Sequence, residues 1–210
     1  MNPHGLQKRI VVGITGASGA EYARRLVECL CRQGVDVHVI VTPNGRRLFV
    51  DELSIREVTA ASITGDEKSS IVMHSYRDVG SVLGSGSFHT DGMIVCPCSG
   101  NTIGSIAAGL ADNLLSRAAA VTLKEGRCLI LVPREMPLGR LELQNLLRIN
   151  EAGGIICPAC PGFYMRPQRI SDLVDFVVGK LLDLVGVGHD LHTRWADQVA
   201  GNTPPEAPVP

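Results

Sequence analysis

The sequence has no long apolar run and almost no net charge. None of its apolar stretches approaches the ~20 residues that a bilayer-spanning helix needs, and residues 1–6 lack the apolar segment of a secretory signal. The formal net charge is −1, which gives no electrostatic reason to expect nucleic acid or an anionic membrane as a partner. We therefore expect a cytoplasmic protein that binds neither nucleic acid nor membrane.

Aromatic residues are few, and the number of cysteines is odd. One Trp, three Tyr and four Phe are too few for a base-stacking platform. Seven cysteines in mostly apolar contexts favour reduced, buried thiols over a disulfide framework. Cys157 and Cys160 have the C-x-x-C spacing of redox motifs and zinc knuckles, but Pro161-Gly162 follows them instead of a helix. We expect core thiols at strand ends and no metal.

Apolar runs alternate with stretches of helical periodicity along most of the chain. The expected strands cover residues 9–14, 35–41, 92–97, 128–133 and 154–158, and the expected helices cover 20–33, 43–50, 101–123, 139–151 and 170–186. Several strands are apolar on both faces, which is typical of a parallel sheet covered by helices. The pattern predicts a three-layer α/β fold with a doubly wound, mostly parallel sheet. We expect one domain over residues 1–198, an irregular segment over 51–91, and a Pro-rich, disordered tail over 199–210.

The first apolar run ends in a turn of small residues, Thr15-Gly16-Ala17-Ser18-Gly19, before a helix begins. Such a turn presents free N–H groups and a helix N-terminus, which together suit a phosphate. The spacing of Gly13, Gly16 and Gly19 does not match G-x-G-x-x-G, and Thr42, not an acidic residue, ends the second run. These features favour a mononucleotide such as FMN over a dinucleotide. A turn required only by backbone geometry is the alternative.

Polar residues follow five of the apolar runs. These groups are Thr15 to Gly19, Thr42, Ser99 to Thr102, Arg134-Glu135, and Phe163 to Pro167. Because ligands of parallel sheets bind beyond the carboxyl ends of the strands, we expect the five loops to converge on one rim. Arg134 can hold a phosphate and Glu135 can move a proton, although a solvated ion pair at a helix start is the alternative for both.

Other charged and polar residues are ambiguous by themselves. Lys124 closes a helix, where a lysine commonly compensates the helix dipole. Tyr164 caps a pocket or fills a gap, and Lys180, between apolar neighbours, reaches either solvent or a phosphate. His38 lies inside an expected strand and is interpreted as structural. The histidines show no spacing typical of a nucleophile or a metal site.

Five motifs together resemble those of one enzyme family. They are GITGASGA at 13–20, PCSGNT at 97–102, NLLSRAAAVTLKE at 113–125, LVPREMP at 131–137 and PGFYMRPQ at 161–168. In this order and composition they are similar to the flavin prenyltransferases of the UbiX type, long described as aromatic-acid decarboxylases. The resemblance covers about residues 9 to 198.

The resemblance implies a Rossmann-like homo-oligomer, usually a dodecamer, with sites at subunit contacts. The members of this family bind FMN and join a dimethylallyl group from dimethylallyl phosphate to N5 and C6 of the reduced flavin, without a metal. The product, prenylated FMN, then serves a partner decarboxylase of the UbiD type.

The family's functional positions transfer to this chain motif by motif. The flavin would be held by Gly16, Ala17, Ser18, Thr42, Ser99, Gly100, Asn101, Thr102 and Arg134. Tyr164, Lys180 and Lys124 would grip the prenyl phosphate. Glu135 would be the acid/base residue, Glu52 a second carboxylate near the phosphate, and Ser18 would position the reacting flavin edge or shuttle its proton. The chain departs from the family at Thr42 (usually Ser) and at Pro43-Asn44-Gly45 (usually Lys-Ala-Ala), and Lys180 stands where relatives have Arg or Lys.

Two other functions compete with this interpretation. A related flavoprotein of the cysteine-decarboxylase type shares a motif close to PCSGNT, but lacks the combined KE, PRE and FYxRP motifs. The other alternative is that the chain is a non-catalytic, flavin-carrying subunit of an aromatic-acid decarboxylase.

Overall fold

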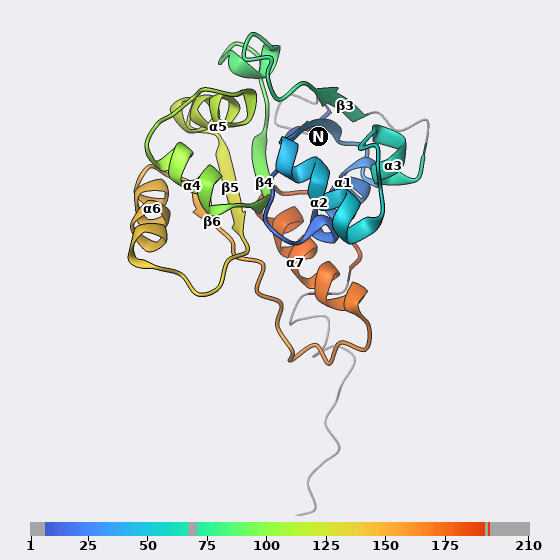
Figure 1. Ribbon diagram of the computed structural model, residues 1–210. Helices are drawn as coiled ribbons and strands as arrows, with labels where there is room; N and C mark the ends of the chain where they lie inside the picture. Colours follow the sequence, from blue (N-terminus) through green and yellow to red (C-terminus); the bar gives the residue numbers. More distant parts are fainter. Residues whose placement is uncertain (1–6, 67–70, 192, 194–210) are drawn as a thin grey trace, which may run out of the picture.

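The computed structural model describes residues 7–66, 71–191 and 193 (Figure 1). Within these residues, six strands form one sheet in the order β3-β2-β1-β4-β5-β6, and every neighbouring pair is parallel. The strands are β1 (Arg9–Ile14), β2 (Asp36–Val41), β3 (Ile71–His74), β4 (Gly92–Cys98), β5 (Cys128–Pro133) and β6 (Ile155–Ile156). The helices are α1 (Ala20–Arg32), α2 (Pro43–Leu53), α3 (Ala60–Thr64), α4 (Gly100–Ala107), α5 (Leu114–Lys124), α6 (Arg140–Glu151) and α7 (Ile170–Leu184), with a short 3₁₀ turn, η1 (Val82–Gly84).

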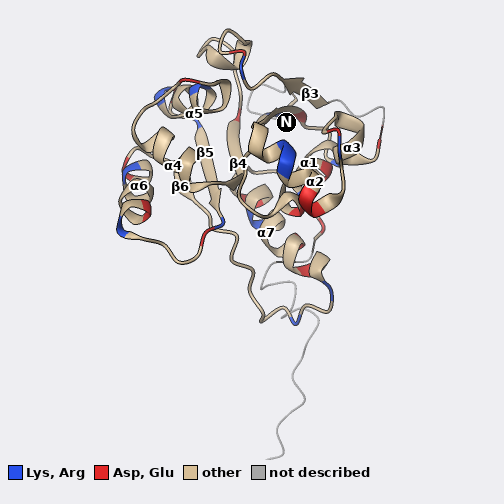
Figure 2. Ribbon diagram, viewed as in Figure 1, with Lys and Arg blue, Asp and Glu red and all other residues tan. Residues whose placement is uncertain are grey.

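Helices cover both faces of the sheet, which gives the three layers expected from the sequence (Figure 1). Successive residues of a strand point to opposite faces, so Val12 packs under α1 and α7 whereas Val11 packs under α4 and α5. Figure 2 shows that the charged residues lie mainly on helices and loops, while β4 and β5 are almost free of them. The apolar runs of the sequence are thus the middle layer of the fold.

The expected fold class and most strands are confirmed, but three expected segments were wrong. The helix expected over 101–123 is two helices, α4 and α5, because Gly109 adopts a positive φ of 69° and Asn113 caps α5 by accepting a hydrogen bond from the Ser116 N–H. The segment 51–91 is more regular than expected, since it contains the end of α2, then α3, β3 and η1. The last strand spans only Ile155–Ile156. The expected tail, 199–210, lies outside the described residues.

The order of the strands creates one switch point. From β1 the chain adds β2 and β3 on one side, and then crosses to add β4, β5 and β6 on the other. The loops that leave β1 and β4 therefore diverge to opposite faces of the sheet and open a crevice between the carboxyl ends of two adjacent strands. None of the helices in the described ranges is long and apolar enough to cross a membrane.

One glycine lets α2 approach the end of β1. Gly45 lies in the first turn of α2, and a Cβ added there would lie 2.6 Å from the Ile14 carbonyl oxygen. Such a contact forces the backbone to move. Gly45 therefore fixes how closely the start of α2 packs against the switch point.

We expect Gly45→Ala to lower the free energy of unfolding by about 1–3 kcal/mol, because the clash outweighs the gain in helix propensity. Gly104→Ala in α4 is the matched control, since its added Cβ would meet only the Asn145 side chain at 3.6 Å. That change should raise stability by up to about 1 kcal/mol. Urea unfolding at one protein concentration measures both, and equal effects would contradict the packing argument.

Candidate functional site

A threonine joins the two strands that border the switch point. The Thr15 hydroxyl is buried; it donates to the Pro97 carbonyl (2.8 Å) and accepts from the Ser99 N–H (2.8 Å). The Thr15 N–H also donates to the Pro97 carbonyl, at 3.2 Å. These bonds hold the loop after β1 beside the loop after β4. The sequence placed Thr15 among the polar strand ends, but gave no signal of this bridging role.

The loop after β4 starts helix α4. The Ser99 hydroxyl accepts from the Thr102 N–H (3.4 Å) and lies 3.1 Å from the Thr102 hydroxyl, so Ser99 caps the helix. Asn101 is exposed on the first turn. Ser99, Gly100, Asn101 and Thr102, all expected to bind flavin, therefore form the N-terminus of α4 at the switch point.

Helix α2 begins against the first loop. Thr42 donates its N–H to the Ile14 carbonyl (3.0 Å), and its hydroxyl caps α2 by accepting from the Gly45 N–H (3.0 Å). A Cβ on Gly16 would lie 2.5 Å from the Asn44 Cβ, so a side chain at position 16 would displace the start of α2. The starts of α2 and α4 are therefore both held against the loop after β1, and a helix N-terminus favours an anion.

Glu52, from the last turn of α2, places its carboxylate on the N-terminus of α1. Its carboxylate accepts hydrogen bonds from the Gly19 N–H (3.0 and 3.2 Å) and the Ala20 N–H (2.8 Å) at the start of α1. A glycine is required at position 19, where φ is 128°. The contact demonstrates that the turn expected to bind phosphate holds oxygen anions through backbone N–H groups.

The Arg134-Glu135 pair reaches the same loop from the end of β5. Arg134 Nε donates to the Ser18 carbonyl at 3.2 Å, which fixes the arginine beside the first loop. Glu135 is exposed, and its Oε1 accepts from the Met136 N–H at 3.3 Å. Ser18 is exposed on the same loop. The structure thus brings Arg134 to the loop of Ser18, as the rim hypothesis predicts, and Glu52, which only the resemblance had indicated, contacts the same loop.

Tyr164 and Lys180 belong to a neighbouring part of the rim. The Tyr164 ring packs edge-on against Phe176 of α7, with centroids 5.6 Å apart, and Lys180 is exposed one helical turn beyond Phe176. Burial raises the pKa of the Cys157 thiol, just after β6, and the charge of the nearby Lys180 offsets part of that rise. The phenol of Tyr164 and the ammonium of Lys180 therefore belong to one side of α7, next to the end of β6.

Lys124 lies at the opposite edge of the sheet. It is the last residue of α5, four residues before β5 begins, and its ammonium pairs with Glu125 at 3.3 Å. Glu135 follows the end of β5, and a six-residue strand spans about 20 Å. Within one chain, the structure does not bring Lys124 to the other expected site residues.

A pair of histidines joins β2 to β3. His38 Nδ1 is 2.8 Å from His74 Nε2, and His74 Nδ1 is 3.0 Å from the Ser81 hydroxyl. Burial lowers the pKa of both histidines, so at neutral pH the pair is uncharged. It ties β2, β3 and η1 together, in line with the structural role expected for His38.

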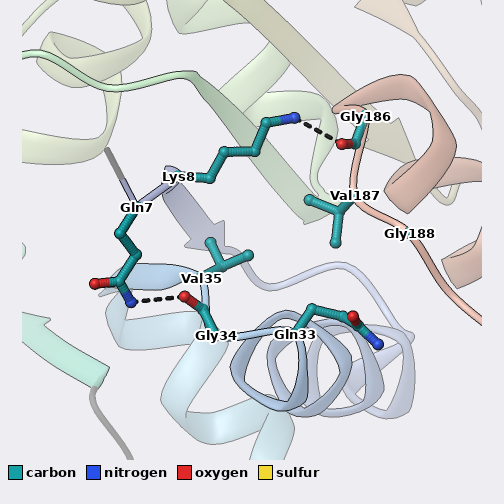
Figure 3. Close-up of a pocket in the computed structure, with 8 residues that line it drawn as sticks. All are labelled: Gln7, Lys8, Gln33, Gly34, Val35, Gly186, Val187 and Gly188. Carbon is teal, nitrogen blue, oxygen red and sulfur yellow. Dashed lines mark hydrogen bonds between the residues drawn. The ribbon is translucent and has the colours of Figure 1, made fainter. Parts of the chain in front are cut away.

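A hollow of 430 Å³ lies where β1 and β2 begin (Figure 3). Lys8 Nζ donates to the Gly186 carbonyl (2.7 Å) and Gln7 Nε2 donates to the Gly34 carbonyl (2.6 Å) across its wall. Both carbonyls belong to residues that follow helices α7 and α1. The hollow is therefore on the edge remote from the switch point and contains none of the expected site residues.

The cysteines differ partly from expectation. Cys29, Cys96 and Cys98 are buried thiols, as expected, but Cys160 is exposed and Cys157 is only half-buried. The expectation of core thiols was therefore wrong for Cys160. The short β6 is the reason, because the chain leaves the sheet before it reaches this residue.

Comparisons with known proteins agree with this geometry. The family model Flavoprotein matches residues 2–182. The flavin prenyltransferase UbiX of Halalkalibacterium halodurans is 44% identical over 191 residues, covering 89% of this chain and 93% of the relative. A 45% identical UbiX of Thermoplasma acidophilum matches over 193 residues, 89% of this chain and 99% of the relative.

Solved structures agree as well. AnUbiX (PadA1), crystallised in complex with FMN and dimethylallyl pyrophosphate, superposes with a TM-score of 0.83 at 36% identity, over 90% of this chain and 98% of that chain. A dodecameric FMN-dependent UbiX-like decarboxylase from Escherichia coli O157:H7 superposes with a TM-score of 0.80 at 38% identity, over 89% of this chain and 98% of that chain. The chain belongs to the flavoprotein family and, within it, to the flavin prenyltransferases of the UbiX type.

Proposed function

We propose that this chain transfers a dimethylallyl group from dimethylallyl phosphate to N5 and C6 of reduced FMN. The product, prenylated FMN, would be passed to a decarboxylase of the UbiD type. The observation that carries the proposal is that the loop after β1 is in contact with the start of α2, the capped start of α4 and Arg134 at the carboxyl ends of the strands. The identity to UbiX enzymes and the FMN and dimethylallyl pyrophosphate bound by AnUbiX support it.

The residues at the switch point fit a flavin mononucleotide. The FMN phosphate is a dianion that backbone N–H groups and helix dipoles can hold; the hydrogen bonds from the Gly19 and Ala20 N–H groups to the Glu52 carboxylate support this proposal. Arg134 and the capped turn of Ser99 to Thr102 add a cation and polar groups around it. When bound, the reduced flavin supplies the nucleophilic nitrogen and carbon.

The remaining rim residues suit an allylic phosphate as leaving group. Tyr164 and Lys180 would hold the phosphate, since a phenol and an ammonium both donate hydrogen bonds to oxyanions. Positive charge and a proton make phosphate a better leaving group, and Glu135 would transfer that proton. Ser18, on the loop fixed by Arg134, would position the flavin edge. Exclusion of water protects the allylic electrophile.

Lys124 would contribute to the site of a neighbouring copy of the chain. In its own chain it lies about one strand length, roughly 20 Å, from the rim. The resemblance to enzymes with sites at subunit contacts, and the dodecamer reported for the Escherichia coli protein, support a contribution across a contact.

Helix α6 offers a surface for such a contact. Leu141 and Leu147 are 71% and 57% exposed, and the neighbouring Met136 is 87% exposed. Only Ile149 of this helix is buried. A large exposed apolar patch of this kind marks a protein–protein interface, and we propose that other copies of the chain cover it in a homo-oligomer, as large as a dodecamer.

The rival functions have weaker support. The FMN-dependent cysteine decarboxylase TvaF is 16% identical with a TM-score of 0.59, which establishes a shared fold alone. A non-catalytic flavin carrier would bind FMN and leave it unchanged.

Anaerobic incubation with reduced FMN and dimethylallyl phosphate distinguishes the transferase from these two alternatives. A flavin heavier by one C5 unit, with phosphate released, supports the transferase, and an unchanged flavin contradicts it.

We expect Glu135→Gln to retain FMN binding and to slow prenyl transfer by about 10²–10⁴-fold, because an amide cannot transfer the proton. Flavin fluorescence titration measures binding, and mass spectrometry of the flavin follows transfer. Glu57→Gln, at an exposed position between α2 and α3, is the control and should behave as the unchanged protein. Loss of FMN binding in Glu135→Gln would show that this residue serves the flavin and not the reaction.

We expect the variants Lys124→Met and Ser18→Ala each to transfer the prenyl group slowly when assembled alone. Oligomers that contain both variants should transfer it faster, because the two chains supply each other's missing side chain. If Lys124 serves the site of a neighbouring copy, a site is intact when its own chain carries Ser18 and the neighbouring chain carries Lys124. In an equal mixture of the two variants, about a quarter of the sites meet both conditions. Co-expression with two affinity tags isolates the mixed oligomer, and its transfer rate is compared with those of the two pure variants. Activity no greater than their average would place Lys124 in its own chain's site or outside any site.

We expect the double change Leu141→Glu and Leu147→Glu to convert the oligomer to smaller species, because charges on both sides of a buried contact repel and lose hydration. Analytical ultracentrifugation measures the change. Val50→Glu, at an exposed apolar position of α2, tests whether any added charge has this effect. An unchanged mass for the α6 variant would exclude this helix from the contact.

A further inference from the structure

The Thr15 hydroxyl makes two hydrogen bonds whose directions are fixed. A carbonyl can only accept and a backbone N–H can only donate, so the hydroxyl donates to the Pro97 carbonyl and accepts from the Ser99 N–H, each at 2.8 Å. Thr15 is only 1% exposed, so its hydroxyl finds its partners in the protein and not in solvent. The Thr15 N–H also donates to the Pro97 carbonyl, and that bond would remain without the hydroxyl. The Ser99 N–H, by contrast, would lose its partner.

Ser99 connects this hydroxyl to helix α4. Its N–H donates to Thr15, its carbonyl accepts from the Ile103 N–H at 3.0 Å, and its hydroxyl accepts from the Thr102 N–H at 3.4 Å. One of these bonds goes to the residue that follows β1, and the other two go to the first turn of α4. The Thr15 hydroxyl therefore sets where the first turn of α4 lies relative to the end of β1.

Two of the helices beside the loop after β1 begin with few free N–H groups. At the start of α1, the Gly19 and Ala20 N–H groups donate to the Glu52 carboxylate. Helix α2 begins with Pro43, which has no N–H, and the Gly45 N–H donates to the hydroxyl that caps this helix. Most of the donors at these two starts are therefore absent or already engaged.

The start of α4 keeps its first two N–H groups free. Gly100 and Asn101 begin the helix, where an N–H has no partner within the helix, and neither N–H makes another hydrogen bond within the described residues. A Cβ added to Gly100 would meet no atom within 4 Å, so the space beside this backbone is open. The Ser99 and Thr102 hydroxyls, 3.1 Å apart, belong to the same turn. These groups suit the phosphate of a ligand that lies at the switch point.

We propose that Thr15 is a positioning residue for flavin binding. Its hydroxyl holds Ser99, and Ser99 holds the first turn of α4 where the Gly100 and Asn101 N–H groups receive the phosphate of FMN. The inference rests on the proposed function, because that function makes FMN the ligand. The buried Thr15 side chain acts only through Ser99 and does not touch the flavin. Loss of the hydroxyl therefore weakens binding of the phosphate end and leaves the reacting ring system in place.

Titration of flavin fluorescence tests this role in the full chain. We expect Thr15→Val, which removes the hydroxyl and keeps the shape, to raise the Kd for FMN at least about tenfold, and Thr15→Ser, which keeps the hydroxyl, to stay within about twofold of the unchanged protein. Thr122→Val is the matched control, since Thr122 is 3% exposed and its hydroxyl donates to the Ala118 carbonyl of α5 at 2.8 Å. The control should bind FMN as the unchanged protein does. If Thr15→Val does not fold, Thr15→Ala makes the same test with a smaller side chain.

Riboflavin, which has the same ring system but no phosphate, separates positioning from general damage to the fold. We expect Thr15→Val to bind riboflavin as the unchanged protein does, so that only the preference for FMN over riboflavin falls, at least about tenfold. Equal losses of affinity for both flavins, or an unaltered Kd for FMN, would overturn the proposal.

The transfer reaction gives a second, independent readout. With saturating reduced FMN, we expect Thr15→Val to keep kcat and the KM for dimethylallyl phosphate within about twofold, because the lost interaction serves binding alone. A fall in kcat with unaltered FMN affinity would contradict the role assigned to Thr15. If the unchanged protein forms no prenylated flavin, the proposed function is wrong, and the two titrations still decide whether Thr15 positions the phosphate site.

Discussion

The buried hydroxyl of Thr15 is the interaction on which the site depends. It accepts from the Ser99 N–H in the loop after β4 and donates to the Pro97 carbonyl near the end of β4, so the ends of these two strands are held at one separation. These two strands are the neighbours at which the sheet changes direction. The bridge therefore sets the positions of two further contacts at the crevice. These are the Ser99 cap of α4 and the hydrogen bond from Arg134 to the Ser18 carbonyl.

The chemistry of the rim follows from helix ends more than from side-chain charge. The starts of α2 and α4 contact the loop after β1, and the Glu52 carboxylate accepts hydrogen bonds from two N–H groups at the start of α1. Glu52 thereby ties the end of α2 to the first loop of the rim, although it lies on another helix.

A single chain carries only part of the arrangement. The rim holds Glu135, Arg134 and the helix N-termini, whereas Lys124 lies at the opposite edge beside the start of β5. The leucines exposed along α6 give a physical reason for copies to associate. In this interpretation, the oligomer completes the site, and the apolar surface that drives assembly is a functional part of the protein.

The sequence by itself determined the layers of the fold and the convergence of the polar loops, because apolar period and small-residue turns are local properties. It also identified the family, since five motifs occur in order. It did not separate α4 from α5, because a single glycine with positive φ interrupts an otherwise continuous periodicity, and it did not find β3, whose four residues end in a polar histidine. Only the tertiary structure revealed the Thr15 bridge, the Glu52 carboxylate on α1, the exposure of Cys160 and the remoteness of Lys124. Each of these depends on contacts or distances between residues far apart in the chain, which no local pattern encodes.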